Sequence, residues 1–221
     1  MLLYHDFSGL TRFQELFNTA EDLIKFSPEH AMSYRVFTAL DLSEQVISDI
    51  LRFRDIFEPY HPTILRWTKT DQLHLTLKFV GELHESHLQP IQQQMGEIFT
   101  KVGEFQLRLQ GAGIFPHPRN PRILWVGISP VPALTEIARM NEELFHAFGY
   151  PVEKRPFMPH ITIARFKDDC SHRELLTFQS FWQEQKKDFQ SQQIMDHLTF
   201  YQSTLTRQGP TYRIIARVKF H

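Results

Sequence analysis

The stretch Leu73-His74-Leu75-Thr76-Leu77-Lys78 alternates leucine with polar side chains. This alternation predicts a β-strand with one buried face, because successive side chains of a strand point to opposite sides of its sheet. The leucines then pack into a core, and His74, Thr76 and Lys78 share the other face. The strand therefore presents an imidazole, a hydroxyl and an ammonium group on one surface.

A second stretch, Pro159-His160-Ile161-Thr162-Ile163, repeats the pattern and places His160 beside Thr162. A third match, His197-Leu198-Thr199-Phe200, occurs near the end of the sequence. A strand that merely turns polar residues toward solvent has the same four-residue pattern. The pattern alone therefore does not identify a site, and its surroundings must decide.

Two imidazoles that face each other across a cleft are suited to in-line displacement at phosphorus. One can take a proton from water while the other gives a proton to the leaving oxygen, and histidine titrates near neutral pH. The hydroxyls of Thr76 and Thr162 can donate hydrogen bonds to the phosphate oxygens and hold the phosphorus in place. Such a scheme needs no metal ion.

Hydrophobic periodicity along the rest of the chain predicts two rounds of strand, helix and strand. This order predicts an α+β protein of two lobes, each an antiparallel sheet backed by helices, with the site in the cleft between them. A Gly/Pro-rich loop is expected at 111–121. The predicted strands are 34–42, 64–68, 73–80, 105–109, 123–128, 160–166, 196–205 and 211–220, and the predicted helices lie near 47–57, 88–102, 134–148 and 173–186.

The first 33 residues have a different pattern. Residues 10–26 place apolar side chains on one helical stripe, and Ser27-Pro28 would end that helix. We interpret residues 1–33 as an amphipathic helical extension of the domain at 34–221. The helix packs on its own domain, or it binds a partner or a membrane surface.

Composition limits the class of protein. The 221 residues include 24 Lys+Arg against 25 Asp+Glu, so there is no overall positive charge to bind many phosphates along a duplex, and we expect a small substrate or a nucleic-acid end. Cys170 is the only cysteine, which excludes an intrachain disulfide and a multi-cysteine zinc site. With neither a secretory signal nor an apolar run long enough for a membrane span, we expect a cytoplasmic protein that does not insert into membranes and is a monomer.

Four blocks of the sequence resemble a known family. They are residues 34–42 (YRVFTALDL), 73–82 (LHLTLKFVGE), 111–116 with 121–127 (GAGIFP and PRILWVG), and 155–165 (RPFMPHITIAR). In this order they resemble the bacterial and archaeal RNA 2′,3′-cyclic phosphodiesterases, long labelled 2′-5′ RNA ligases, of the two-histidine phosphoesterase superfamily. The resemblance covers about residues 34–220 and leaves residues 1–33 without a counterpart.

The resemblance implies a bilobal fold and a catalytic set of His74, Thr76, His160 and Thr162. It implies that His74 protonates the leaving 3′ oxygen, that His160 activates water, and that an RNA 2′,3′-cyclic phosphate opens to a 2′-phosphomonoester. The reverse reaction would make a 2′-5′ linkage. It also implies no metal ion and no organic cofactor, and it leaves His197 outside the signature motifs, in the strand that has the family's Tyr-x-Ser at Tyr201 and Ser203.

Other residues near the motifs are candidates for substrate binding. Lys78 shares the predicted face of His74 and could pair with a phosphate, or it is an ordinary solvated charge. Arg165 matches the family's arginine after the second motif, yet strict alternation turns it away from His160 unless the strand has a bulge or ends there. Phe37, Phe79 and Trp67 could stack a base or belong to the core.

Two points stay open at this level. The segment 165–193 is longer than the family pattern, and its aromatic residues Phe178, Phe181 and Trp182 either cap the cleft or pack. Two other functions also remain: a non-catalytic module that binds a nucleotide or RNA end, and a phosphodiesterase of small cyclic nucleotides. Intact His/Thr pairs in both lobes favour an enzyme, because binding alone does not require two proton-transfer groups.

Overall fold

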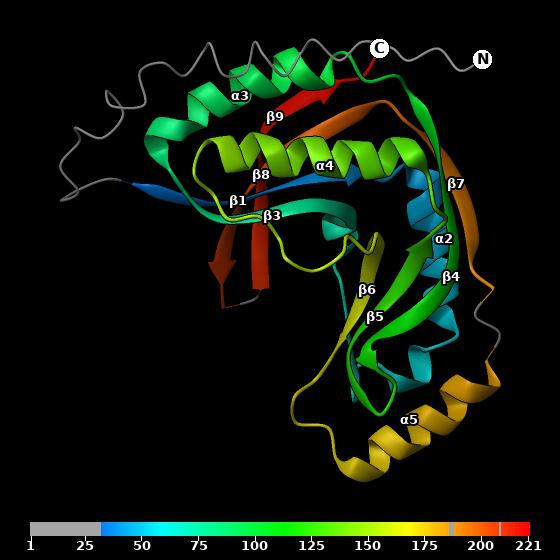
Figure 1. The fold of residues 1–221 in the computed structure, drawn as a ribbon. Helices are drawn as coiled ribbons and strands as arrows, with labels where there is room; N and C mark the ends of the chain where they lie inside the picture. Colours follow the sequence, from blue (N-terminus) through cyan, green and yellow to red (C-terminus); the bar gives the residue numbers. More distant parts are fainter. Residues whose placement is uncertain (1–31, 186–187, 208) are drawn as a thin grey trace. The chain divides into compact units, whose positions relative to one another are not determined.

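The two histidine stretches form strands of different sheets. His74 begins β3 (His74–His84) and His160 begins β6 (His160–Phe166) in a computed structural model that describes residues 32–185, 188–207 and 209–221 (Figure 1). The predicted helix at 10–26 lies outside the described residues. The interpretation of residues 1–33 does so too, because only residues 32 and 33 of this segment are described. Strand β1 (Ser33–Asp41) opens the domain.

Both sheets are antiparallel. The first has the order β3-β1-β8-β9 and the second the order β2-β6-β5-β4-β7. The predicted α+β fold of two antiparallel sheets is therefore confirmed. The remaining strands are β2 (Leu65–Trp67), β4 (Phe105–His117), β5 (Asn120–Ile128), β7 (Gln190–Met195), β8 (His197–Thr206) and β9 (Gly209–Lys219).

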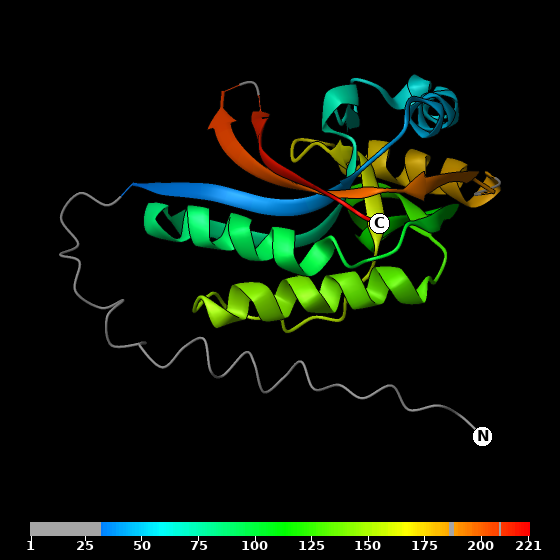
Figure 2. The same ribbon diagram turned by 90° about the horizontal axis from the view of Figure 1, so that it is seen from above.

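Four α-helices in the described residues cover the sheets: α2 (Glu44–Asp55), α3 (Glu85–Phe99), α4 (Pro132–Ala147) and α5 (His172–Glu184). Helices α3 and α4 lie side by side against the first sheet (Figures 1 and 2). Helix α2 follows β1 of the first sheet but packs against β7 of the second. The two lobes therefore exchange helices, which ties each sheet to the other half of the chain.

Local signals explain where these helices begin. The Ser43 hydroxyl accepts a hydrogen bond from the Val46 amide and caps α2. Ser171 and Glu174 form a capping box at the start of α5. Pro132 starts α4, where its missing amide hydrogen costs no helical hydrogen bond. Short 3₁₀ turns at Glu58–Tyr60 and Thr70–Gln72 lead into β2 and β3.

Two expectations need correction. Most of the predicted loop at 111–121 is strand, because β4 runs on to His117 and only a tight turn separates it from β5. Gly111 has a φ of 72°, and the register of β4 with β5 shifts between Leu109 and Ala112. A glycine in the left-handed region lets the strand bend without ending. Strand β7 was not predicted, since its polar sequence hides the alternation.

The aromatic side chains of the long segment pack into the core. Phe178 and Trp182 of α5 are buried, and the Phe178 ring lies 5.0 Å from that of Phe166 in β6. The packing interpretation of this segment is therefore confirmed over capping of the cleft. None of the helices in the described residues combines the length and apolar character needed to cross a lipid bilayer.

Candidate active site

A cavity of about 560 Å³ lies between the two sheets and collects both histidine motifs. His74 and Thr76 enter it from β3, and His160 and Thr162 enter it from β6. Residues 86 positions apart, such as 74 and 160, therefore line one space. A substrate phosphate in this cavity would have an imidazole and a hydroxyl on each side.

The two imidazoles are held in the same way. Nδ1 of His74 lies 2.7 Å from the carbonyl oxygen of Gln72, and Nδ1 of His160 lies 2.7 Å from that of Met158. A carbonyl only accepts, so Nδ1 carries the hydrogen in both rings. The neutral tautomer then has its lone pair on Nε2, which is the atom left to exchange protons.

His74 is the more enclosed of the two. Burial lowers its pKa, and the nearby charge of His160 lowers it further, while the hydrogen bond to Gln72 and the charge of Asp41 act in the opposite direction. The net shift is downward.

The His160 ring rests on aromatic side chains of the second sheet. Its centroid lies 5.0 Å from Phe115 and 6.4 Å from Trp125. Gly113 makes room for this arrangement, because a Cβ there would come within 2.1 Å of the Trp125 ring. The Gly-x-Phe sequence of β4 therefore supports the second histidine rather than forming a flexible loop.

A β-bulge follows each motif and changes which side chains face the cleft. Between β1 and β3 the register shifts from Thr38–Lys78 to Ala39–Thr76. Residues after the shift have the opposite orientation from that of simple alternation. Lys78 thus turns out of the cleft, and Phe79 turns into it.

The prediction that Lys78 shares the cleft face of His74 is therefore wrong, and so is the alternative of an ordinary solvated charge. Its side chain is 3% exposed, and its Nζ lies 2.6 Å from Glu142 of α4 and 3.0 Å from the carbonyl oxygen of Pro151. Glu142 also accepts a hydrogen bond from the Glu153 amide. Lys78 thus fastens α4 and the start of the segment that leads to His160, instead of binding phosphate.

The corresponding bulge in β6 brings Arg165 to the site. Between β5 and β6 the register shifts from Leu124–Ala164 to Trp125–Thr162, and Arg165 lines the cavity. The bulge that the sequence alone could not locate is present. Arg165 thus occupies in the second lobe the place that Phe79 has in the first.

The cavity wall is basic and aromatic. Its cations are Arg35, Arg66, Lys69 and Arg165, and among the described residues its lining includes no carboxylate. Phe79 is 53% exposed, and the Arg35 guanidinium lies 4.8 Å from its ring centre. These side chains suit a polyanion that has a planar base.

Phe37 and Trp67 line the cavity but are already packed. Phe37 is 3% exposed, with its ring 5.0 Å from His74 and 4.9 Å from Tyr212. Trp67 stacks on His61 at 5.8 Å. We therefore assign Phe37 to packing against the His74 ring. Phe79, in contrast, has an exposed ring that is available for stacking.

Residues 45–206 match the family model described as the 2′-5′ RNA ligase superfamily. This match spans most of the domain and includes both motifs. The chain belongs to this superfamily. The residues matched begin inside α2 and end with β8, so they contain all of the second lobe's motif strand and the bulge behind Arg165.

The chain is also similar to curated proteins that are named RNA 2′,3′-cyclic phosphodiesterases. An RNA 2′,3′-cyclic phosphodiesterase of Aeropyrum pernix is 31% identical over 160 residues, which is 70% of this chain and 86% of the relative. One from Methanothermobacter thermautotrophicus is 27% identical over 181 residues, 82% of this chain and 96% of the relative. The crystal structure of E. coli LigT complexed with 3′-AMP is 26% identical, with a TM-score of 0.69 and coverage of 86% and 99%.

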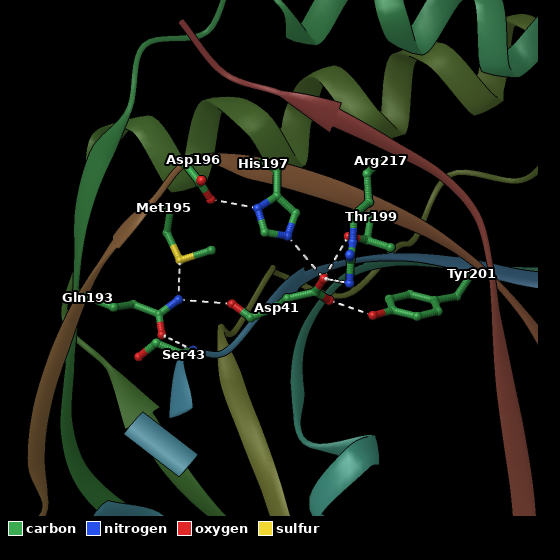
Figure 3. A network of polar contacts seen from close by, with 9 residues as sticks. All are labelled: Asp41, Ser43, Gln193, Met195, Asp196, His197, Thr199, Tyr201 and Arg217. Carbon is green, nitrogen blue, oxygen red and sulfur yellow. Dashed lines mark hydrogen bonds and ion pairs between the residues drawn. The ribbon is translucent and has the colours of Figure 1, made fainter. Parts of the chain in front are cut away.

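A polar network centred on Asp41 lies in the first sheet, which also contains His74 (Figure 3). The Asp41 carboxylate accepts hydrogen bonds from Nε2 of His197 at 3.0 Å and from Tyr201 at 2.5 Å. Thr199 and Arg217 donate to it as well, at 2.9 and 3.1 Å. Burial alone would raise the pKa of Asp41, but the hydrogen bonds from His197, Tyr201 and Thr199 outweigh it and lower the pKa to about 2. Sequence reasoning missed this network, because its members come from three strands.

His197 is held between two carboxylates. Its Nε2 lies 3.0 Å from Asp41 and its Nδ1 lies 2.6 Å from Asp196. Since carboxylates only accept, this arrangement favours the charged ring, in which both nitrogens carry hydrogens. The hydrogen bond to Asp41 is the main reason that the pKa of His197 is raised. His197 does not line the cavity, although it begins the third His-x-Thr match.

The charged state of His197 predicts how stability depends on pH. A histidine whose pKa is raised by folding adds stability that is fully present below about 6.5, its unfolded value, and is lost as the pH rises through the folded pKa. We therefore expect His197→Gln to lower the free energy of unfolding most at about pH 6 and progressively less at higher pH. Urea unfolding at several pH values measures this, and a difference that grows with pH would contradict it.

Other histidines of the superfamily member have ordinary local roles. Nδ1 of His84 accepts from the Ser86 amide at the start of α3, and Nδ1 of His87 lies 2.9 Å from the Tyr150 hydroxyl. Within the described residues, no group of three or more His, Cys, Asp or Glu side chains is arranged to hold a metal ion.

Proposed function

We infer that this protein is an RNA 2′,3′-cyclic phosphodiesterase, a hydrolase that opens a terminal 2′,3′-cyclic phosphate to a 2′-phosphomonoester. The observation that carries the inference is the matched pair of imidazoles in one cavity, each with Nδ1 bonded to a carbonyl and Nε2 left free. Membership of the 2′-5′ RNA ligase superfamily and the names of the curated relatives support it.

In the proposed reaction, water attacks phosphorus opposite the 3′ oxygen. His160 takes a proton from the water as the new O–P bond forms, and His74 gives a proton to the 3′ oxygen as its bond to phosphorus breaks. Thr76 and Thr162 donate hydrogen bonds to the two non-bridging oxygens, where negative charge is held during displacement. With a 5′ hydroxyl in place of water, the same groups would join two ends through a 2′-5′ linkage.

The cationic wall supports RNA over a lone cyclic nucleotide as the substrate. A single cyclic phosphate carries one negative charge, whereas Arg35, Arg66, Lys69 and Arg165 supply four positive ones. Additional phosphates of an RNA chain would balance them. We propose that Arg165 binds the reacting phosphate and that the exposed ring of Phe79 stacks a base.

The test is incubation of the protein with an oligoribonucleotide that ends in a 2′,3′-cyclic phosphate, with excess chelator present. We expect a 2′-phosphate product, because the histidines supply both proton transfers. Adenosine 2′,3′-cyclic monophosphate should react with a lower kcat/KM. Equal or better turnover of this small nucleotide would favour the small-molecule phosphodiesterase, and tight binding without turnover would favour the binding module. Activity lost in chelator and restored by a divalent ion would contradict the two-histidine mechanism.

A further inference from the structure

The two lobes of the cleft repeat one local arrangement, and one position breaks the repeat. In the first sheet β1 pairs with β3 so that Asp41 lies opposite His74. In the second sheet β5 pairs with β6 so that Gly127 lies opposite His160. The second pair is the first pair shifted by 86 residues, from position 74 to 160 and from 41 to 127. The first histidine therefore faces a carboxylate, and the second faces a glycine.

This difference is built into the backbone of the second lobe. A Cβ atom at Gly127 would come within 2.6 Å of the carbonyl oxygen of Gln110 in the neighbouring strand β4. Backbone atoms of a paired strand cannot move aside as the end of a flexible side chain can. An aspartate at position 127 would therefore require β4 and β5 to separate, so only the first lobe can have a carboxylate opposite its histidine.

Asp41 is positioned to act on His74. Residues directly opposite in an antiparallel pair share one face of the sheet, with Cβ atoms about 4.5–5.5 Å apart. On its other side β1 pairs with β8, where Ala39 lies opposite Thr199, and two more residues of that register bring Asp41 level with His197. Asp41 thus lies in a row between two imidazoles, closer to His74 than the cation of His197 is (Figure 3 shows its contacts with β8 and β9).

We propose that Asp41 is the positioning residue that makes His74, rather than His160, the proton donor of the reaction. The inference rests on the proposed phosphodiesterase function. A negative charge beside an imidazole favours its protonated form, and a donor must start the reaction protonated. Asp41 also holds Tyr201, whose ring stacks on Phe37 at 5.1 Å, and Phe37 in turn contacts the His74 ring.

Asp41 favours a protonated His74, and the cationic groups around the imidazole oppose it. Burial has the largest effect on the pKa of His74 and lowers it, and the charge of His160, which faces it from β6, lowers it further. The hydrogen bond to Gln72 and the charge of Asp41 raise it. The rings of Tyr201 and Tyr212 lie 6.5 and 5.5 Å from the imidazole. The remaining charges in the cavity wall are all cations, which disfavour a protonated imidazole: Arg35, Arg66, Lys69 and Arg165.

The experiment compares wild type with Asp41→Asn by two measurements. The first is the NMR titration of the His74 imidazole, which should move to lower pH in the variant. The second is kcat/KM against pH on the cyclic-phosphate oligonucleotide. If His74 is the donor, the variant loses activity on the neutral and alkaline side, about tenfold for each unit of pKa shift, and keeps it at the acid end. If His74 were the acceptor, the variant would instead gain activity at the acid end.

Two further variants separate the charge of Asp41 from its structural role. His197→Gln removes the cation behind Asp41 and should move the His74 titration in the opposite direction, to higher pH. Asp196→Asn removes the other carboxylate bound to His197, which is 50% exposed, and should move it far less than Asp41→Asn does. An unchanged His74 titration in both Asp41→Asn and His197→Gln, or a loss of activity that is equal at every pH, overturns the inference. A wild-type protein without activity overturns the proposed function instead, and the titration still decides the effect of Asp41.

Discussion

His74→Ala and His160→Ala should each lower kcat/KM on a cyclic-phosphate oligonucleotide by about a hundredfold to ten-thousandfold. Proton transfer by a positioned side chain is typically worth this much, and alanine leaves neither Nε2 atom to exchange a proton. Both strands are anchored in the core by their apolar side chains, such as Leu75 and Ile161, so the variants should fold. Steady-state measurement of kcat/KM, beside circular dichroism of each variant, tests the expectation.

The matched controls are the threonines and the double variant. Thr76→Ala and Thr162→Ala remove one hydrogen bond each while the acid/base pair survives, so each should lose less than its neighbouring histidine. Removing both histidines should cost less than the product of the single losses, because the two groups act as a unit. If His197→Ala lost as much activity as His160→Ala, the assignment of the motifs would be wrong. Full activity in either single histidine variant would contradict the mechanism itself.

Strand alternation predicted the cleft faces of both motifs as far as the threonines. His74 and Thr76, like His160 and Thr162, face the cavity because the register of their strands is regular at these positions. Beyond them the prediction failed, since each strand has a bulge whose position depends on the neighbouring strand. For this reason Lys78, which was expected in the cleft, is buried, and Arg165, which was expected to point away, lines the cavity. A period-two pattern has no signal for a single inserted residue.

The Asp41 network could not be predicted for a different reason. Asp41 and Arg217 are far apart in the sequence and meet only because β1, β8 and β9 are neighbours in one sheet. The sequence placed Asp41 at the end of an ordinary strand, where a carboxylate is usually solvated. Its significance depends on comparison with Gly127, and that comparison needs the registers of both sheets.

Lys78 connects the two motif strands through the core rather than through the substrate. It follows His74 and Thr76 in β3, and its ammonium group holds Glu142 and the carbonyl oxygen of Pro151. The chain then continues from Pro151 to Met158, whose carbonyl oxygen orients His160. An ammonium group enclosed in this way is stabilising only while both partners are present, because an unpaired charge left in the interior is costly.

We therefore expect Lys78→Met to lower the free energy of unfolding by about 3 kcal/mol, the lower end of the range for a broken buried pair, since Glu142 keeps some access to water. Arg139→Met on the same helix is the matched control. Arg139 pairs with Glu136 and Glu143, but these side chains are at least half exposed, so its loss should cost less than about 1 kcal/mol. Replacing both partners, as Lys78→Met with Glu142→Leu, should recover much of the stability, because no unpaired charge remains. Urea unfolding measures all three variants.

At a temperature where Lys78→Met is folded, its KM should equal that of wild type, since Lys78 does not face the cavity. A raised KM with unchanged stability would indicate that Lys78 contacts the substrate and would contradict the bulge.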